Sequence, residues 1–150
     1  MLKVLSLGHL VLRVAQLDRA VAFYRDVLGL QLVARRLIGG TEMAFFRIGT
    51  NHHDLALVES PASSRVPASG GTGLVHFALK VGDNLGQLRA AREHLAARGI
   101  PIDRIVEHRV AQSLYLRDPD DHVLELYVDA DPAIWRKDPA TVAHSEPMLL

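Results

Sequence analysis

The stretch that decides the fold occurs twice, as HLVLRV at residues 9–14 and as HFALKV at residues 76–81. Each copy has a histidine, two apolar residues, a leucine, a cation and a valine. Because side chains of a β-strand alternate between its two faces, each copy predicts a strand with one apolar face and one more open face that carries the histidine. A duplicated histidine on the open face of a duplicated strand is typical of half of a metal site.

The composition predicts one globular domain. The chain has 150 residues, of which 49% are apolar and 23% charged, with no formal net charge. The balanced charge gives no reason to expect nucleic acid or a membrane as a partner. The absence of cysteine excludes disulfides, thiolate nucleophiles and cysteine-ligated metals. No apolar run is long enough to span a bilayer, and the N-terminus lacks the pattern of a signal peptide. We therefore expect a cytoplasmic protein, and its eight histidines are the unusual feature.

A helix and three extended stretches follow the first copy of the pattern. The helix is expected over Arg19–Leu28, with Asp18 as its N-cap and Gly29 at its end. The extended stretches are Gln31–Arg35, Glu42–Ile48 and Asp54–Val58.

The second copy is followed by the same series. A helix is expected from Asp83-Asn84 to Gly99, and the extended stretches are Ile102–Glu107, Gln112–Arg117 and Val123–Val128. The chain thus predicts one α+β domain, residues 1–150, built from two βαβββ units. Its parts are unit one (about 4–59), a Ser-, Pro- and Gly-rich linker (60–73), unit two (about 74–129) and an irregular tail (130–150).

The two units differ in one carboxylate. An alignment of their last two strands matches residues 46–53 with residues 115–122, so that Phe46 corresponds to Tyr115 and Ala56 to Glu125. Glu125 shares its strand face with Val123 and Tyr127, while the leucines on either side of it point to the core. An unpaired carboxylate in such a strand is costly, and a metal ion would offset that cost. The second unit therefore offers a histidine and a carboxylate, whereas the first offers only its histidine.

These residues and motifs resemble those of the vicinal oxygen chelate (glyoxalase/bleomycin resistance/dioxygenase) superfamily, over residues 4–129. The resemblance implies that the two βαβββ units pair around a metal in a cup. Within the superfamily the chain is most similar to the extradiol catechol 2,3-dioxygenases, whose well-known members contain two such domains where this chain has one. A metal-dependent ring-cleaving dioxygenase of aromatic catabolism, acting on a catechol-like aromatic with O2, is the function that the resemblance implies.

The resemblance also implies the roles of individual residues. The metal ligands would be His9, His76 and Glu125, a set that suits Fe(II), with Mn(II) or another divalent ion as alternatives. His53 would be the acid–base, with His52 as its competitor. Tyr115 and His108 would donate hydrogen bonds to substrate oxygens, and the protein would be a homodimer.

Three other functions stay open. A glyoxalase-type lyase or isomerase would need a fourth ligand where this chain has Ala56. A fosfomycin-type thiol transferase shares the three ligands but needs neither His53 nor Tyr115. A drug-sequestering binding protein typically lacks the ligands altogether. The run from Asp118 to Asp121, followed by His122, predicts a turn rather than a carboxylate site, with Asp121 in place of the usual turn glycine.

Overall fold

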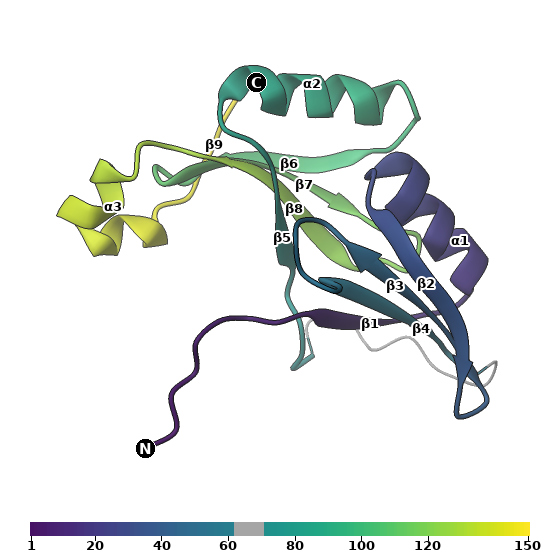
Figure 1. Ribbon diagram of the computed structural model, residues 1–150. Helices are drawn as coiled ribbons and strands as arrows, with labels where there is room; N and C mark the ends of the chain where they lie inside the picture. Colours follow the sequence, from purple (N-terminus) through teal and green to yellow (C-terminus); the bar gives the residue numbers. More distant parts are fainter. Residues whose placement is uncertain (62–70) are drawn as a thin grey trace. The chain divides into compact units, whose positions relative to one another are not determined.

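Two mixed β-sheets, each with helical structure against one face, form the described part of the computed structural model, residues 1–61 and 71–150 (Figure 1). The chain divides into an N-terminal unit, Met1–Gly71, and a C-terminal unit, Thr72–Leu150. The predicted α+β class and the predicted order of elements are confirmed. Of the expected linker 60–73, residues 62–70 lie outside the described residues. No helix in the described ranges is both long and apolar enough to cross a membrane.

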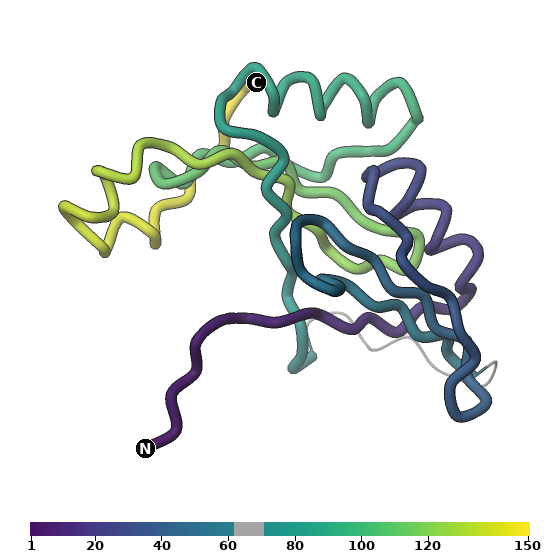
Figure 2. Tube along the Cα trace, viewed as in Figure 1, coloured from purple at the N-terminus to yellow at the C-terminus, as the bar shows by residue number. Residues whose placement is uncertain are grey.

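The N-terminal unit contains a four-stranded sheet in the order β1-β4-β3-β2. β1 pairs with β4 in parallel, and the other pairs are antiparallel. Figure 2 shows that the chain ahead of β1 runs away from this sheet, in agreement with the exposure of Leu2, Val4, Leu5 and Leu7. The elements are β1 (Leu10–Val14), α1 (Leu17–Ala22), the π-helix η1 (Phe23–Val27), β2 (Gln31–Ile38), β3 (Thr41–Arg47) and β4 (Leu55–Glu59).

The C-terminal unit repeats this plan and adds a strand, in the order β5-β8-β7-β6-β9. β5 pairs with β8 in parallel, as β1 does with β4. The elements are β5 (Phe77–Gly82), α2 (Leu85–Ala96), β6 (Ile102–Glu107), β7 (Ala111–Arg117), β8 (Val123–Asp129), α3 (Ala133–Lys137), the 3-10 helix η2 (Pro139–Ala143) and β9 (Glu146–Pro147).

The core of each unit lies between its helix and its sheet. α1 contacts β3 and β4, and α2 contacts β5, β7 and β8. Alternation along the strands directs their apolar residues to this side and leaves the histidine-bearing face on the other. The large apolar residues buried on this side include Leu12, Val14, Phe46, Leu55 and Leu57 in the N-terminal unit, and Leu114, Leu116, Leu124, Leu126 and Val128 in the C-terminal unit.

Strand register confirms the predicted equivalence of Ala56 and Glu125. Ala56 lies opposite Val11 and Phe45, and Glu125 lies opposite Ala78 and Tyr115. The counterpart of Tyr115 is therefore Phe45, not Phe46 as the alignment implied. The reason is that Phe45 and Ala56 are eleven positions apart in the chain, whereas Tyr115 and Glu125 are ten apart, so the register of β3 against β4 is shifted by one position.

The first helix begins earlier than its sequence suggests. α1 starts at Leu17, whose side chain is buried, and the preceding Gln16 makes no side-chain cap. The prediction that Asp18 caps the helix is wrong, because burial of Leu17 places Asp18 inside the first turn. There its carboxylate accepts a hydrogen bond of 2.5 Å from Arg35 of β2. The second half of the helix is not α-helical as predicted but the π-helix η1, and this helical segment ends where predicted, with Gly29 in the left-handed region at φ 74°.

The second helix has the ends that its sequence predicts. The Asn84 side chain accepts a hydrogen bond of 3.1 Å from the Gln87 backbone N–H, which satisfies one of the unpaired donors of the first turn. At the other end Gly99 has φ 66°, a conformation that glycine adopts at little cost.

The C-terminal tail is more regular than predicted. The Asp131 and Asp138 carboxylates accept hydrogen bonds from the Ala133 and Ala140 backbone N–H groups, which starts α3 and η2. β9 then pairs antiparallel with the edge strand β6, with Pro147 opposite Val106. The expectation of an irregular tail was wrong because these Asp-Pro signals begin short helices, and because an edge strand offers free backbone hydrogen-bonding groups.

The turn between β7 and β8 is built around Asp118, as the sequence predicts. The buried carboxylate accepts hydrogen bonds from the Asp120 and His122 backbone N–H groups at 2.8 and 2.9 Å. Its second oxygen lies 2.8 Å from Nδ1 of His122, and this hydrogen bond raises the pKa of His122 above its usual 6.5. Asp121 takes the left-handed position of the turn at φ 66°.

We expect the His122–Asp118 pair to make stability depend on pH. A raised pKa in the folded state means that the stabilisation is complete below pH 6.5 and is lost as pH rises through the raised value. The loss of unfolding free energy caused by His122→Gln should therefore be larger, by about 1 to 2 kcal/mol, near pH 5.5 than near pH 9. Urea unfolding of both proteins at the two pH values measures this. An equal loss at both values would contradict the assignment.

Candidate metal centre and active site

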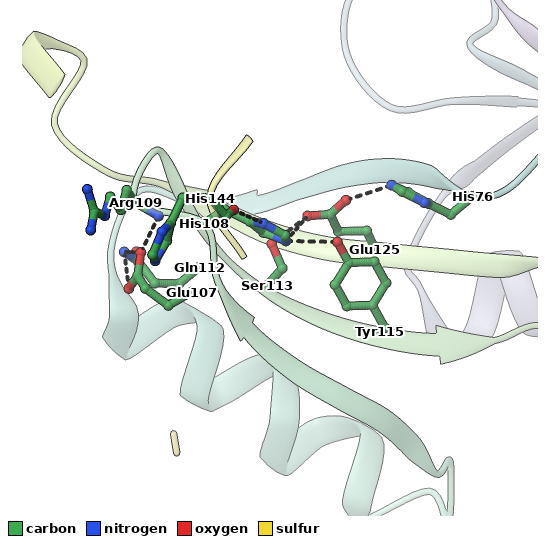
Figure 3. A network of polar contacts seen from close by, with 9 residues as sticks. All are labelled: His76, Glu107, His108, Arg109, Gln112, Ser113, Tyr115, Glu125 and His144. Atoms are coloured by element: carbon green, nitrogen blue, oxygen red, sulfur yellow. Dashed lines mark hydrogen bonds and ion pairs between the residues drawn. The ribbon is translucent and has the colours of Figure 1, made fainter. Parts of the chain in front are cut away.

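His76 and Glu125 form the centre of a polar cluster on the open face of the C-terminal sheet (Figure 3). His76 directly precedes β5, and Glu125 lies on β8, which pairs with β5 in parallel. This pairing brings Nε2 of the imidazole to 3.1 Å from Oε2 of the carboxylate. The Nδ1 atom of His76 is buried and has no hydrogen-bond partner among the described residues. Two side chains that commonly bind metals therefore meet at one point.

The Glu125 carboxylate is held by a donor that the sequence analysis did not identify. Ser113 of β7 is fully buried, and its hydroxyl donates a hydrogen bond of 2.5 Å to Oε1 of Glu125. The side chain of Glu125 is only 12% exposed. A serine at such a buried position, in a strand of leucines, is the signal that could have revealed this role. The hydroxyl fixes one carboxylate oxygen and leaves the other directed at His76.

Tyr115 and His108 lie in contact beside this pair. Tyr115 is buried on β7, directly opposite Glu125, and its hydroxyl oxygen lies 2.9 Å from Nε2 of His108. The same Nε2 is 3.8 Å from Oε1 of Glu125, and the Tyr115 ring meets the His76 ring edge-on at 5.5 Å. Four of the predicted site residues thus cluster in the C-terminal unit.

The C-terminal tail orients His108. Its Nδ1 lies 2.9 Å from the backbone carbonyl oxygen of His144. A carbonyl oxygen can only accept, so Nδ1 carries a proton and Nε2 of the neutral ring is free to accept one from Tyr115. The hairpin around His108 is held by Glu107, whose carboxylate accepts from the Arg109 backbone N–H at 2.6 Å and from the Gln112 amide (Figure 3). No feature of the sequence pointed to His144.

The surroundings of Tyr115 keep its hydroxyl protonated. Burial raises the pKa of Tyr115, and the negative charge of Glu125 raises it further. The Arg104 guanidinium, which lies 3.9 Å above the centre of the tyrosine ring, acts in the opposite direction but more weakly. A tyrosine with a raised pKa is a hydrogen-bond donor at neutral pH, and this is the role that the sequence predicts for it.

The other two predicted residues, His9 and His53, lie together in the N-terminal unit. His9 directly precedes β1, and His53 lies in the connection between β3 and β4. Their ring centres are 4.4 Å apart. His53 also contacts Phe45 edge-on, and its Nδ1 lies 2.6 Å from Nδ1 of His52. One of two imidazole nitrogens at this distance must carry a hydrogen and donate it to the other. The rings of His52 and His53 are therefore joined by a hydrogen bond.

Loss of hydration lowers the pKa of His53, and its histidine neighbours lower it further. The ring is therefore neutral at physiological pH, the state that a general base requires. The position of His53, with its ring edge-on to that of Phe45 and close to that of His9, favours it over the exposed His52 for this role.

The donor set of the C-terminal unit fits a divalent metal. An imidazole and a carboxylate converge, and the carboxylate is buried and oriented by a serine, as metal-binding carboxylates commonly are. Within residues 1–61 and 71–150 no three histidine, aspartate or glutamate side chains come close enough to hold a metal by themselves. The pair His76–Glu125 therefore needs a further ligand, and His9 belongs to the N-terminal unit.

The sequence profile of the Glyoxalase/Bleomycin resistance protein/Dioxygenase superfamily matches residues 6–126. The chain belongs to this superfamily, as its duplicated pattern predicts. A solved glyoxylase/bleomycin resistance protein/dioxygenase domain from Frankia sp. EAN1pec has the same fold, with a TM-score of 0.74 at 22% identity over 85% of this chain and 100% of that one.

Curated relatives include enzymes of two kinds. The chain is 31% identical over 88% of its length to Catechol-2,3-dioxygenase of Bacillus subtilis, and 36% identical over 82% to Biphenyl-2,3-diol 1,2-dioxygenase 3 of Rhodococcus globerulus. It spans 44% and 63% of the lengths of these two relatives. It is also 31% identical, over 81% of its length and 79% of the relative's, to the metallothiol transferase FosB of Shouchella clausii.

We expect Ser113→Ala to destabilise the protein by about 1 to 3 kcal/mol, because a buried carboxylate loses its hydrogen-bond donor. Ser145→Ala, a matched change at an exposed position, should alter the free energy of unfolding by less than about 0.5 kcal/mol. Urea unfolding of the metal-free proteins measures both. Equal stability of the two variants would show that the Ser113 hydroxyl does not support Glu125.

Proposed function

We propose that the protein is a metal-dependent extradiol dioxygenase that cleaves the ring of a catechol-like aromatic with O2. The observation that carries the proposal is the cluster in which Tyr115 and His108 adjoin the His76–Glu125 pair. A dioxygenase needs such donors beside its metal, whereas a thiol transferase does not. The names of the two dioxygenase relatives support the same activity.

We propose His9, His76 and Glu125 as the metal ligands, with Fe(II) as the metal and Mn(II) or another divalent ion as alternatives. Two histidines and one carboxylate on one face of an octahedral ion are the ligand set of non-haem Fe(II) oxygenases. When bound, the ion would supply adjacent open positions for the catechol oxygens and dioxygen, and the redox chemistry that joins them.

The protein's own residues supply the proton chemistry. His53, neutral because its pKa is lowered, takes a proton from a catechol hydroxyl and later returns one. Tyr115, protonated because its pKa is raised, has one hydroxyl proton to donate. In this structure its hydroxyl lies 2.9 Å from Nε2 of His108, while the His144 carbonyl oxygen accepts from Nδ1 of His108. When substrate binds, we expect the Tyr115 hydroxyl to turn its proton from His108 to a substrate oxygen.

A second candidate is a metal-dependent thiol transferase. The similarity to the metallothiol transferase FosB favours it, and that relative is matched over a larger share of its length than either dioxygenase. It would use the same three ligands but leave His53 and Tyr115 without a role. Oxygen uptake with catechols, compared with thiol consumption in the presence of an epoxide, separates the two candidates.

We expect the protein to bind about one divalent ion per chain and to lose it when a ligand is removed. His9→Ala, His76→Ala and Glu125→Ala should each reduce the metal content to near zero after anaerobic loading with Fe(II), as measured by mass spectrometry of the metal. His94→Ala, a histidine change on the exposed surface of α2, is the matched control and should retain the ion. Retention of metal by all three ligand variants would refute the ligand assignment.

The same variants test whether His9 is supplied by the same chain or by a second copy in the proposed homodimer. If two chains share each site, a mixture of His9→Ala and Glu125→Ala proteins forms some dimers with one intact site and recovers part of the bound metal. If each chain holds its own site, the mixture recovers none.

We expect His53→Phe to keep its metal but to lower turnover about 100- to 10,000-fold, the usual range for a lost general acid–base. His52→Phe, the matched change at the neighbouring histidine, should have a much smaller effect. Tyr115→Phe removes one hydroxyl and should raise the activation barrier by about 2 to 4 kcal/mol. The measurement is oxygen uptake together with the yellow ring-opened product. Wild-type protein loaded with Fe(II) that consumes no oxygen with any catechol would refute the dioxygenase proposal.

A further inference from the structure

A cavity of about 350 Å³ opens on the metal-bearing face of the C-terminal sheet. One side of it follows β8, through Glu125, Tyr127 and Asp129. The four residue-to-residue steps along β8 from Glu125 to Asp129 span about 13 Å, which is longer than a single aromatic ring. A substrate that is bound at Glu125 by its ring therefore leaves room for a substituent toward Asp129.

The remaining walls of the cavity are apolar. Ala78 of β5, and Val110 and Ala111 at the start of β7, form the part contributed by the sheet. Trp135 of α3 and Val142 of η2 form the part contributed by the C-terminal tail. Trp135 is 44% exposed and Val142 62% exposed. An apolar ligand in the cavity would cover these two side chains, and their burial would favour its binding.

The charged residues among the described lining of the cavity are both acidic. Glu125 and Asp129 are carboxylates, and no lysine, arginine or histidine is among the described lining residues. Lys80 of β5 lies beside Asp129 but is shared between Asp129 and Asp83, each at 2.8 Å. Arg136 lies over the Trp135 ring at 5.3 Å from its centre but does not line the cavity. An anionic substituent that extends toward Asp129 would thus meet one lysine already shared by two carboxylates, with no free cation on the described lining to pair with it, which is unfavourable.

We propose that this cavity selects catechols with an uncharged, apolar substituent and discriminates against carboxylated ones, with Trp135 and Val142 as the contacts that determine specificity. The placement of the catechol ring at Glu125 rests on the proposed function. The preference for an apolar over an anionic ligand depends on the cavity alone.

Trp135 is the single tryptophan of the chain, so its emission reports ligand binding without turnover. We would titrate the full-length protein, loaded with Fe(II) under argon, with 3-butylcatechol and with 3-(2,3-dihydroxyphenyl)propanoate. These probes share a chromophore and differ in one end of a short side chain. We expect both probes to cause a saturable change in Trp135 emission. The Kd of 3-butylcatechol should be at least about tenfold lower than that of the carboxylated probe. Equal affinity, tighter binding of the carboxylate or no change in emission would overturn the inference.

Variants of the C-terminal tail test whether Val142 contributes to the preference for an apolar substituent. Val142→Asp should weaken binding of 3-butylcatechol about tenfold, because it adds a charge to the apolar wall. Ala140→Asp adds the same charge to the same short helix outside the cavity lining and should leave the Kd unchanged. Val142→Ala, a milder change, should weaken binding about two- to fourfold. Identical affinities of wild-type protein and both Val142 variants, with circular dichroism showing that they are folded, would overturn the role of the tail.

The outcome for the cavity is separable from the outcome for the reaction. Preferential binding of 3-butylcatechol without oxygen uptake in air would refute the dioxygenase and support the cavity's preference. Ring cleavage of both probes, with a lower KM for the carboxylated probe than for 3-butylcatechol, would support the dioxygenase and overturn the cavity's preference.

Discussion

The buried carboxylate of Glu125 is the constraint on which the polar structure of the C-terminal unit depends. Its strand neighbours are leucines that pack toward α2, so alternation turns Glu125 to the opposite face, where it is nearly covered. A buried carboxylate needs donors or a metal. Ser113 and His76 meet this need from the two flanking strands, β7 and β5. Tyr115 and His108 are then close enough to be influenced by the same charge.

The two units share one arrangement of strands and helix but differ in the side chains at equivalent positions. Both place a histidine directly before a strand that pairs in parallel with the last strand of the βαβββ series. At the equivalent position of that last strand one unit has Ala56 and the other Glu125. The N-terminal unit instead gathers His9, His52 and His53, and there loss of hydration and the two neighbouring histidines lower the pKa of His53. The proposed general base, His53, thus lies in one unit, and Glu125 and Tyr115 lie in the other.

The C-terminal tail serves the site in two ways. Its backbone carbonyl at His144 fixes the proton position on His108, and its side chains Trp135 and Val142 complete the apolar cavity beside Glu125. Short helices started by aspartate carboxylates, and a strand added to the edge of β6, hold the tail against the sheet. Residues outside the repeated units therefore fix the proton position on His108 and line the cavity beside Glu125.

The sequence by itself determined the α+β class, the duplicated βαβββ order, the equivalence of Ala56 with Glu125 and the ends of α2, because these depend on the alternation of side chains and on local capping. It also singled out Tyr115 and His108, which the structure brings to 2.9 Å of each other. Only the tertiary structure decided the start of α1, the counterpart of Tyr115, the order in the tail, and the parts played by Ser113, Arg104 and the His144 carbonyl. These depend on contacts between segments far apart in the chain, and periodicity along one strand or helix predicts which face is buried but not which residues of other segments it meets.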